Sequence, residues 1–156
     1  MLFIAHRGNV RGPSNEENAP WHVEHALAHG FDVEVDVWVD ENTICLGHDE
    51  PEYHIDMSFL SQDGLWCHAK NAKALSLLLE LDQTVFYHQE DNFTITSNGY
   101  IWSYPGCATE PKCIAMEAGF SENVARGLRN ISGVCSDYIW EYRKWFDSSS
   151  GTLTES

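Results

Sequence analysis

The chain has 156 residues, and its 24 acidic side chains against nine Lys and Arg give a formal net charge of −15. A surface this acidic repels nucleic acid and anionic membranes, so neither is an expected partner. The hydrophobic content of 43%, with six Trp, indicates a folded domain rather than a disordered chain. A small anionic substrate stays compatible with the charge, because it needs only a local cation, arginine or lysine.

Short strands are expected to alternate with helices along the chain. Apolar runs predict strands at 2–6, 32–38, 43–47, 65–70, 84–88, 100–104, 112–116 and 132–136. Helical patterns predict helices at 19–29, 71–81, 121–129 and 138–147. The small, polar segment 148–156 is expected to be a flexible tail, which leaves one compact domain over 1–147.

The first residues, MLFIAHRG, favour a strand over a secretory leader, because the apolar run is short and no basic segment precedes it. No stretch approaches the length that crosses a membrane, so stable membrane insertion is not expected. Five cysteines without paired metal spacing favour reduced thiols and a cytoplasmic location. A bridge between Cys107 and Cys113 is the alternative.

Two acidic side chains with one residue between them stand in the valine-rich segment FDVEVDVWV. Side chains alternate along a strand, so Glu34 and Asp36 share one face while Val33, Val35 and Val37 share the other. Neighbouring carboxylates repel each other unless something neutralises them, and a divalent cation with oxygen ligands does so. The pair therefore predicts a metal or phosphate-handling site, with a solvated strand face as the alternative.

An ordered set of motifs in the first third of the chain resembles the glycerophosphodiester phosphodiesterases and the wider phospholipase-C-like phosphodiesterase superfamily. The motifs are AHRGN (5–9), EEN (16–18), AHGFDVEVDVW (28–38) and LGHDEP (46–51). The resemblance implies a metal-dependent phosphodiesterase of lipid metabolism that cleaves a small glycerophosphodiester-like phosphodiester. The alternative is a non-catalytic compact barrel that binds a phosphorylated or sugar ligand.

Eight strand candidates with interspersed helices fit the fold that the resemblance implies, a (β/α)8 TIM-type barrel of parallel strands. Such barrels use roughly 250 residues and rarely fewer than about 200, so 156 residues leave about 20 for each strand–helix unit. We therefore expect a compact, helix-poor barrel in which several crossovers are loops. An incomplete barrel is the alternative, and flanks exposed by short helices are compatible with a homo-oligomer.

Working residues of such a barrel lie on one rim, where the strands end. The resemblance assigns His6 and His48 as general acid and base, in either order, because imidazole titrates near neutral pH. It assigns Arg7 to the phosphate group. Lys70 is expected to face the barrel mouth, where a lysine is costly unless it meets an anion, so we expect it to contact phosphate too.

The expected metal ligands are Glu34, Asp36 and His68. Relatives carry a Glu where LWCHAK places His68, and imidazole favours softer ions than a carboxylate does. Mg²⁺ or Ca²⁺ is the expected ion, with Mn²⁺ or Zn²⁺ as alternatives. His68 as a hydrogen-bond partner of the substrate, or as a residue of the barrel interior, is the other interpretation.

Four more residues are candidates for lining the pocket: Glu17, His88, Trp102 and Asp137. Glu17 matches the Glu-Asn pair that relatives place before the first helix, and it is expected to orient Arg7 or to close the rim. His88 and Asp137 follow expected strands, and Trp102 lies in the aromatic stretch YIWSYPG, where packing is the alternative to substrate contact.

Three histidines on the expected first helix mimic the spacing of metal ligands. They are His22, His25 and His29, with Trp21 and Leu27 among their neighbours. Because no nearby acid needs a cation, surface or packing roles are expected for all three.

Overall fold

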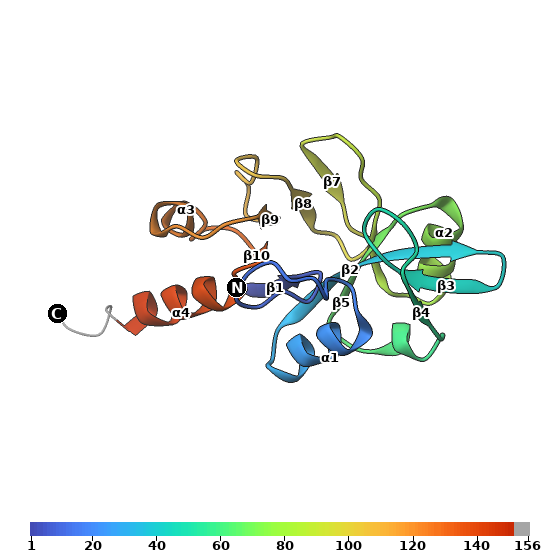
Figure 1. Cartoon of the computed structure of the whole chain (residues 1–156). Coiled ribbons are helices and arrows are strands. Elements are labelled where there is room, and N and C mark those ends of the chain that lie inside the picture. The colour runs from blue at the N-terminus through green and yellow to red at the C-terminus, as the bar shows by residue number, and fades with distance from the viewer. Residues whose placement is uncertain (152–156) are drawn as a thin grey trace.

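The computed structural model describes residues 1–151 as a mixed sheet curved into an open half-barrel, with helices on its outer side (Figure 1). The strands are β1 Leu2–His6, β2 Asp32–Asp40, β3 Thr43–Leu46, β4 Tyr53–Ile55, β5 Leu65–Ala69, β6 Thr84–Phe86, β7 Phe93–Ile95, β8 Ile101–Ser103, β9 Cys113–Glu117 and β10 Gly133–Ser136. The helices are α1 Pro20–Ala28, α2 Ala72–Glu80, α3 Glu122–Gly127 and α4 Ile139–Ser150, and η1 is a 3-10 turn at Phe59–Ser61.

Parallel pairing runs through the wall of the half-barrel in the order β6-β5-β2-β1-β10-β9-β8. Antiparallel strands extend this wall at two places. β3 pairs with the far end of β2 and carries β4 beside it, and β7 pairs with β8. Between β6 and the turn after β7 the backbone N–H of Ser97 donates to the carbonyl oxygen of Val85 at 2.8 Å.

The expected closed barrel of eight parallel strands is wrong. The segment 43–47 is predicted to be a barrel strand, but the chain turns back at Glu41 and Asn42, so β3 pairs antiparallel with β2. Glu41 takes the left-handed φ of 49° that this turn requires. The chain is also shorter than the roughly 200 residues that closed barrels need. The polar, turn-rich segment after β6 forms the antiparallel arm β7 instead of a helical crossover, which leaves the incomplete barrel.

The helices begin where local signals place them. The side chains of Asn71 and Ser121 each accept a hydrogen bond from a backbone N–H in the first turn of α2 and α3, and Pro20 opens α1. All four expected helices are confirmed within a few residues. α4 continues through Ser150, so the expected boundary at 147 falls inside a helix, and the rest of the predicted tail, 152–156, lies outside the described residues.

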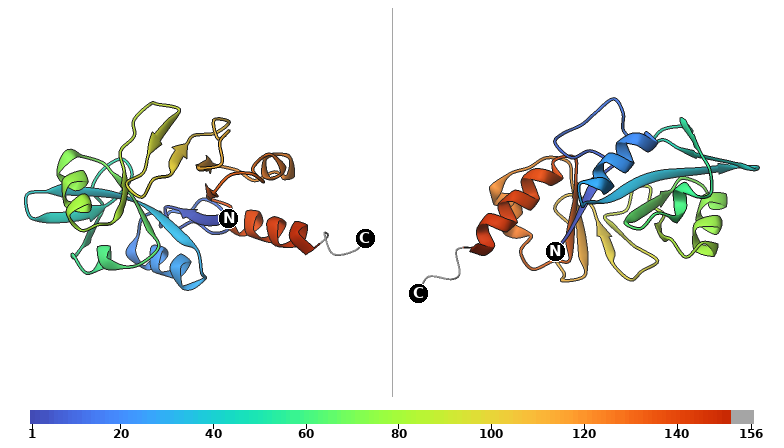
Figure 2. Two further views of the ribbon diagram at one scale, coloured as in Figure 1. Left: turned by 180° about the vertical axis from the view of Figure 1, so that it is seen from behind. Right: turned by 90° about the horizontal axis from the view of Figure 1, so that it is seen from below.

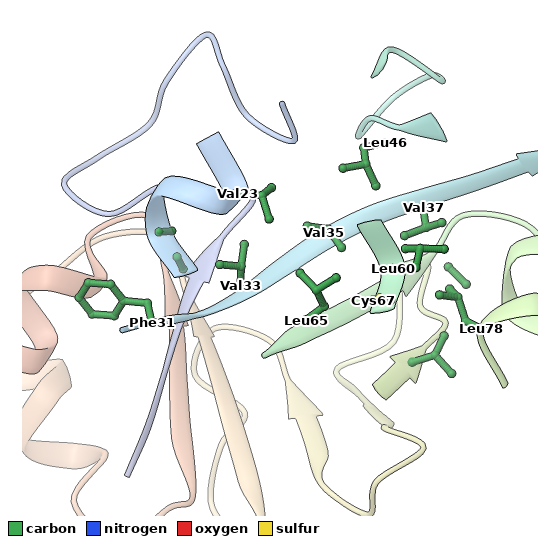
Figure 3. Close-up of a cluster of buried hydrophobic side chains, with 14 of the residues drawn as sticks. Val23, Phe31, Val33, Val35, Val37, Leu46, Leu60, Leu65, Cys67 and Leu78 are labelled. Carbon is green, nitrogen blue, oxygen red and sulfur yellow. The ribbon is translucent and has the colours of Figure 1, made fainter. Parts of the chain in front are cut away.

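The curved sheet has an apolar layer on each face. On the outer face, the valines of β2 pack with Val23 of α1, Leu60 of η1 and Leu78 of α2, as Figure 3 shows. The inner face holds a second buried cluster, made of Ile4, Trp66, Phe86, Trp102, Ile114 and Cys135. Because side chains alternate along β2, outward-facing valines oblige Glu34 and Asp36 to face the concave side.

Helices cover only part of the outer face (Figure 2). α1 and α2 pack on β2, β5 and β6, and α4 lies against β1 and β10. β7 and β8 lie apart from these helices (Figure 1), and Phe93 and Ile95 of β7 expose 62% and 73% of their surface.

Two further expectations concern the cysteines and a membrane-spanning helix. All five cysteines are free thiols, so Cys107 and Cys113 are not bridged. Within residues 1–151, no helix combines the length and the apolar character that a membrane crossing requires.

Candidate metal and phosphate site at the carboxyl ends of the strands

A cavity of about 910 Å³ opens on the inner face of the half-barrel, where the parallel strands end. Candidate residues from distant parts of the sequence line it together: His6, Arg7, Glu34, Asp36, His48, His68, Lys70, His88 and Trp102. Glu17 and Asp137 lie behind this wall rather than in it, where they bond Arg7 and His6. The expectation that Glu17 and Asp137 line the pocket is therefore wrong, whereas the expectation that Glu17 orients Arg7 is confirmed.

Two buried carboxylates form the floor of the site on β2. Glu34 is 3% exposed and Asp36 is 1% exposed. Asn18 holds Asp36 in place, because its amide donates to Oδ2 at 2.9 Å and accepts the Asp36 backbone N–H at 2.9 Å. Arg7 Nε lies 3.5 Å from Oδ2, and Lys70 Nζ and His68 Nδ1 lie 3.5 Å and 3.1 Å from Oδ1, yet none of these contacts gives Oδ1 a hydrogen bond. A buried oxygen without a hydrogen bond is costly, and a bound cation would satisfy it.

The surroundings push the pKa values of the two acids apart. Burial raises the pKa of Glu34 to about 7, and repulsion from Asp36 acts in the same direction. Burial opposes ionisation of Asp36 as well, but His68, Asn18 and Lys70 hold the pKa of that carboxyl well below its usual range. Asp36 is thus the permanent anion of the pair, and Glu34 takes up or releases a proton near neutral pH.

His68 points one ring nitrogen at both carboxylates. Its Nε2 lies 3.2 Å from the backbone oxygen of His88, and a carbonyl only accepts, so Nε2 carries the hydrogen. Its Nδ1 lies 3.1 Å from Asp36 Oδ1 and 4.0 Å from Glu34 Oε1. A ring nitrogen that faces carboxylate oxygens needs a positive charge between them, either a second proton or a cation. Metal-binding histidines commonly donate their other N–H to a carbonyl in this way.

Glu34, Asp36 and His68 fit a divalent cation. Their ligand atoms lie within 4.8 Å of one another, and among residues 1–151 this is the one such group of His, Cys, Asp or Glu side chains. Two carboxylates suit Mg²⁺, Ca²⁺ or Mn²⁺, and the added imidazole suits Mn²⁺ or Zn²⁺.

His6 ends β1 with its ring oriented by a carboxylate. Nδ1 lies 2.8 Å from Asp137 Oδ1, so Nδ1 carries the hydrogen and Nε2 is directed to the cavity, 3.9 Å from Glu34 Oε2. Burial alone would lower the pKa of His6, but the hydrogen bond to Asp137 and the charge of Glu34 raise it. A fixed tautomer with a free Nε2 is the arrangement that general base catalysis needs.

A strained turn delivers Arg7 to the carboxylates. Arg7 and Asn18 both have left-handed backbones, with φ of 54° and 65°, at a cost of about 1 kcal/mol or more for each. Hydrogen bonds hold the turn: the Arg7 N–H donates to Glu34 Oε2 at 3.2 Å, and the Asn18 N–H donates to the Arg7 carbonyl at 3.0 Å. The guanidinium donates to Glu17 Oε2 at 3.0 Å. The turn thus brings a fixed cation to the floor of the cavity.

The balance of charge differs between the floor and the mouth of the cavity. Arg7 and Lys70 are largely buried beside Asp36, with 19% and 16% of their side chains exposed. His48 follows β3 nearer to solvent, with 43% of its side chain exposed and Nδ1 2.7 Å from Asp49. Glu90 joins Asp49 as an exposed acid on the cavity wall. The deep part of the site therefore combines both cations with the two carboxylates of β2, whereas Asp49 and Glu90 add negative charge near the mouth.

Aromatic rings pack beneath the site. The rings of His68 and Phe86 stack with centroids 5.0 Å apart, and Phe86 stacks on Trp102 at 4.4 Å. Trp102 is 1% exposed, which favours the packing interpretation of this residue. His88 stacks on Tyr104 at 3.7 Å, so the loop after β6 is anchored over the inner face. These contacts hold the ring of His68 in its orientation.

Sequence reasoning missed three residues of the site. Asn9 and Asn18 stand inside the motifs AHRGN and EEN without an assigned role of their own, and their place in these motifs is the signal that could have found them. His22 was expected to be a surface or packing residue, but its Nε2 lies 3.0 Å from Asn9 Oδ1. His25 and His29 are exposed, as expected.

The metal-free protein should lose thermal stability as the pH rises from about 5 to about 8. An unfolded glutamate releases its proton near 4.5, whereas folded Glu34 keeps it to about 7, so the folded state binds more protons over this window. His6 contributes in the same direction, because its folded pKa is also raised. The measurement is Tm against pH in EDTA at constant ionic strength. A saturating divalent cation should remove the decline, and a Tm that stays level or rises in EDTA would contradict the prediction.

Comparison with known proteins found no relative: no family model, no curated protein and no solved structure matches the chain. The resemblance to phosphodiesterases therefore rests on the motif residues alone.

Proposed function

We propose that the protein is a metal-dependent phosphodiesterase that cleaves a small, glycerophosphodiester-like phosphodiester. The observation that carries this proposal is the convergence of Glu34, Asp36 and His68 within 4.8 Å, beside Arg7 and Lys70. A divalent cation held by the first three residues supplies positive charge to the oxygens of a bound phosphate. Arg7 and Lys70 bind the same group and offset the charge that grows in the transition state.

His6 is the proposed general base. Its Nδ1–H is committed to Asp137, which leaves Nε2 free to take a proton from the attacking hydroxyl, either water or a hydroxyl of the substrate. His48 lines the same cavity at its exposed side and is the proposed general acid, which protonates the departing oxygen. Asp49 holds the ring of His48 through Nδ1 at 2.7 Å.

The charge distribution narrows the substrate class. Arg7 and Lys70, together with a cation on Glu34 and Asp36, would accept one phosphodiester, whereas Asp49, Glu90 and Asp91 on the cavity wall repel further negative charge. A small phosphodiester with a neutral or cationic substituent therefore suits the cavity better than a polyphosphate or a nucleic acid.

Turnover assays test the proposal. Bis(p-nitrophenyl) phosphate and glycerophosphodiesters should be cleaved only after Mg²⁺, Ca²⁺, Mn²⁺ or Zn²⁺ is returned to EDTA-treated protein. The best ion is informative, because Mn²⁺ or Zn²⁺ is expected if His68 coordinates and Mg²⁺ or Ca²⁺ if only carboxylates do. Phosphorus NMR of the products separates hydrolysis from formation of a cyclic phosphate. A folded protein that turns over nothing with any ion would overturn the proposal in favour of ligand binding alone.

A further inference from the structure

A buried amide lies directly behind the two functional side chains at the end of β1. Asn9 is 0% exposed and does not reach the cavity wall. Its Nδ2 lies 2.8 Å from Asp137 Oδ1 and 2.9 Å from Glu17 Oε1. An amide nitrogen has two hydrogens, and here each one is donated to a different carboxylate.

Each of these carboxylates holds one side chain of the site. Asp137 accepts the Nδ1–H of His6 at 2.8 Å, and Glu17 accepts from the guanidinium of Arg7 at 3.0 Å. We propose that Asn9 is a positioning residue that fixes both carboxylates and thereby aims His6 and Arg7 into the cavity. The kinetic part of this inference rests on the proposed phosphodiesterase function, whereas the geometric part does not.

The orientation of the amide follows from its neighbours. With both hydrogens on carboxylates, Oδ1 of Asn9 faces Nε2 of His22 at 3.0 Å, so Nε2 of His22 must carry a hydrogen and donate it. Burial lowers the pKa of His22, which keeps this ring neutral and its other nitrogen bare at neutral pH. α1 thus contributes an anchor to a site built mainly on strand ends.

Gly8 makes room for this anchor. A Cβ at Gly8 would lie 2.8 Å from Cδ2 of His22, and the backbone φ of +86° is one that side chains rarely adopt. Gly8 and Asn9 therefore act together: Gly8 lets His22 come close, and His22 then donates to the side-chain amide oxygen of Asn9.

The hydrogen bonds of Asn9 show that it does more than fill a buried volume. An apolar residue would fill the volume but leave Asp137 and Glu17 short of one donor each, free to rotate away from their partners. Hydrogen bonds that support metal ligands typically change activity by about 10–100-fold when removed, and we expect an effect of the same order behind His6 and Arg7.

The test compares Asn9→Ala with Ser121→Ala, which removes the N-cap of α3 far from the cavity and serves as a matched destabilised control. Asn9→Ala should lower kcat by about 10–100-fold with a smaller change in KM, while Ser121→Ala keeps wild-type kcat. The rise in Tm on adding the activating cation should be the same in both variants, because neither change touches a metal ligand.

Nitrogen NMR of His6 supplies a readout that needs no turnover. At alkaline pH the wild-type ring should be the Nδ1–H tautomer, and Asn9→Ala should bring in a population of the Nε2–H tautomer. Asn9→Ser, which retains one donor, takes the place of the alanine variant under the same criteria if the latter does not fold. Wild-type kcat together with a wild-type tautomer in these variants would overturn the inference, and a changed tautomer in a protein without turnover would support it while contradicting the proposed function.

Discussion

Replacing His6 by Gln should lower kcat by about 10²–10⁴-fold and leave the fold and metal binding in place. The reason is that Nε2 of His6 is the free basic nitrogen on the cavity floor, set in its tautomer by Asp137. Glutamine fills a similar volume but cannot take up a proton near neutral pH. The measurement is kcat at saturating cation, with Tm and the cation-induced change in Tm recorded for the same preparation.

His54→Gln is the matched control for this experiment, because His54 is exposed on β4 and does not line the cavity. Its kcat should equal that of the wild type. If His6→Gln retains more than about a tenth of wild-type kcat, His6 is not the base that the mechanism requires.

The leaving group separates the roles of the two histidines. p-Nitrophenolate departs without protonation, so a variant that lacks the general acid should retain activity on bis(p-nitrophenyl) phosphate and lose it on a glycerophosphodiester. His48→Gln should behave in this way, whereas His6→Gln should be impaired on both substrates. The opposite pattern would exchange the two assignments.

The alternation of side chains along strands made the centre of the site predictable. The period of two placed Glu34 and Asp36 on one face of 32–38, and the same rule placed His68 and Lys70 together after Trp66. Short-range signals likewise predicted the helices, because Asn71 and Ser121 are N-caps whose partners lie three residues away. Each of these inferences needs only neighbours along the chain.

Such rules do not predict contacts between residues that lie far apart in the sequence. The contact between His6 and Asp137 joins residues 131 apart in the sequence, and sequence spacing does not reveal that distance in space. Likewise, 43–47 has the composition of any strand, and whether it runs parallel or folds back on β2 depends on the turn at Glu41 and Asn42. The prediction of a closed barrel was wrong for the same reason, since the number of strands does not reveal which strands pair.

Glu34→Gln should make the metal-free protein more stable at pH 8 and abolish its activity. Glu34 is 3% exposed beside the permanently ionised Asp36, and its pKa is raised to about 7, so at pH 8 the folded state carries a charge that it disfavours. Glutamine removes that charge and retains an oxygen for the Arg7 N–H, which donates to Glu34 Oε2 at 3.2 Å in the wild type. The Tm in EDTA should therefore rise at pH 8 and change little at pH 5, where Glu34 is already protonated.

The same substitution should remove the rise in Tm that a divalent cation causes and lower kcat by about 10³-fold or more, since it takes one of the two negative charges from the ligand set. Glu24→Gln, at an exposed position on α1, is the control for the loss of one negative charge and should change neither property. A higher Tm at pH 8 in EDTA, together with loss of the cation-induced rise in Tm, would not be expected if residue 34 only filled space in the core. A lower Tm at pH 8, or an active Glu34→Gln protein, would show instead that the carboxylate serves the fold and not the cation.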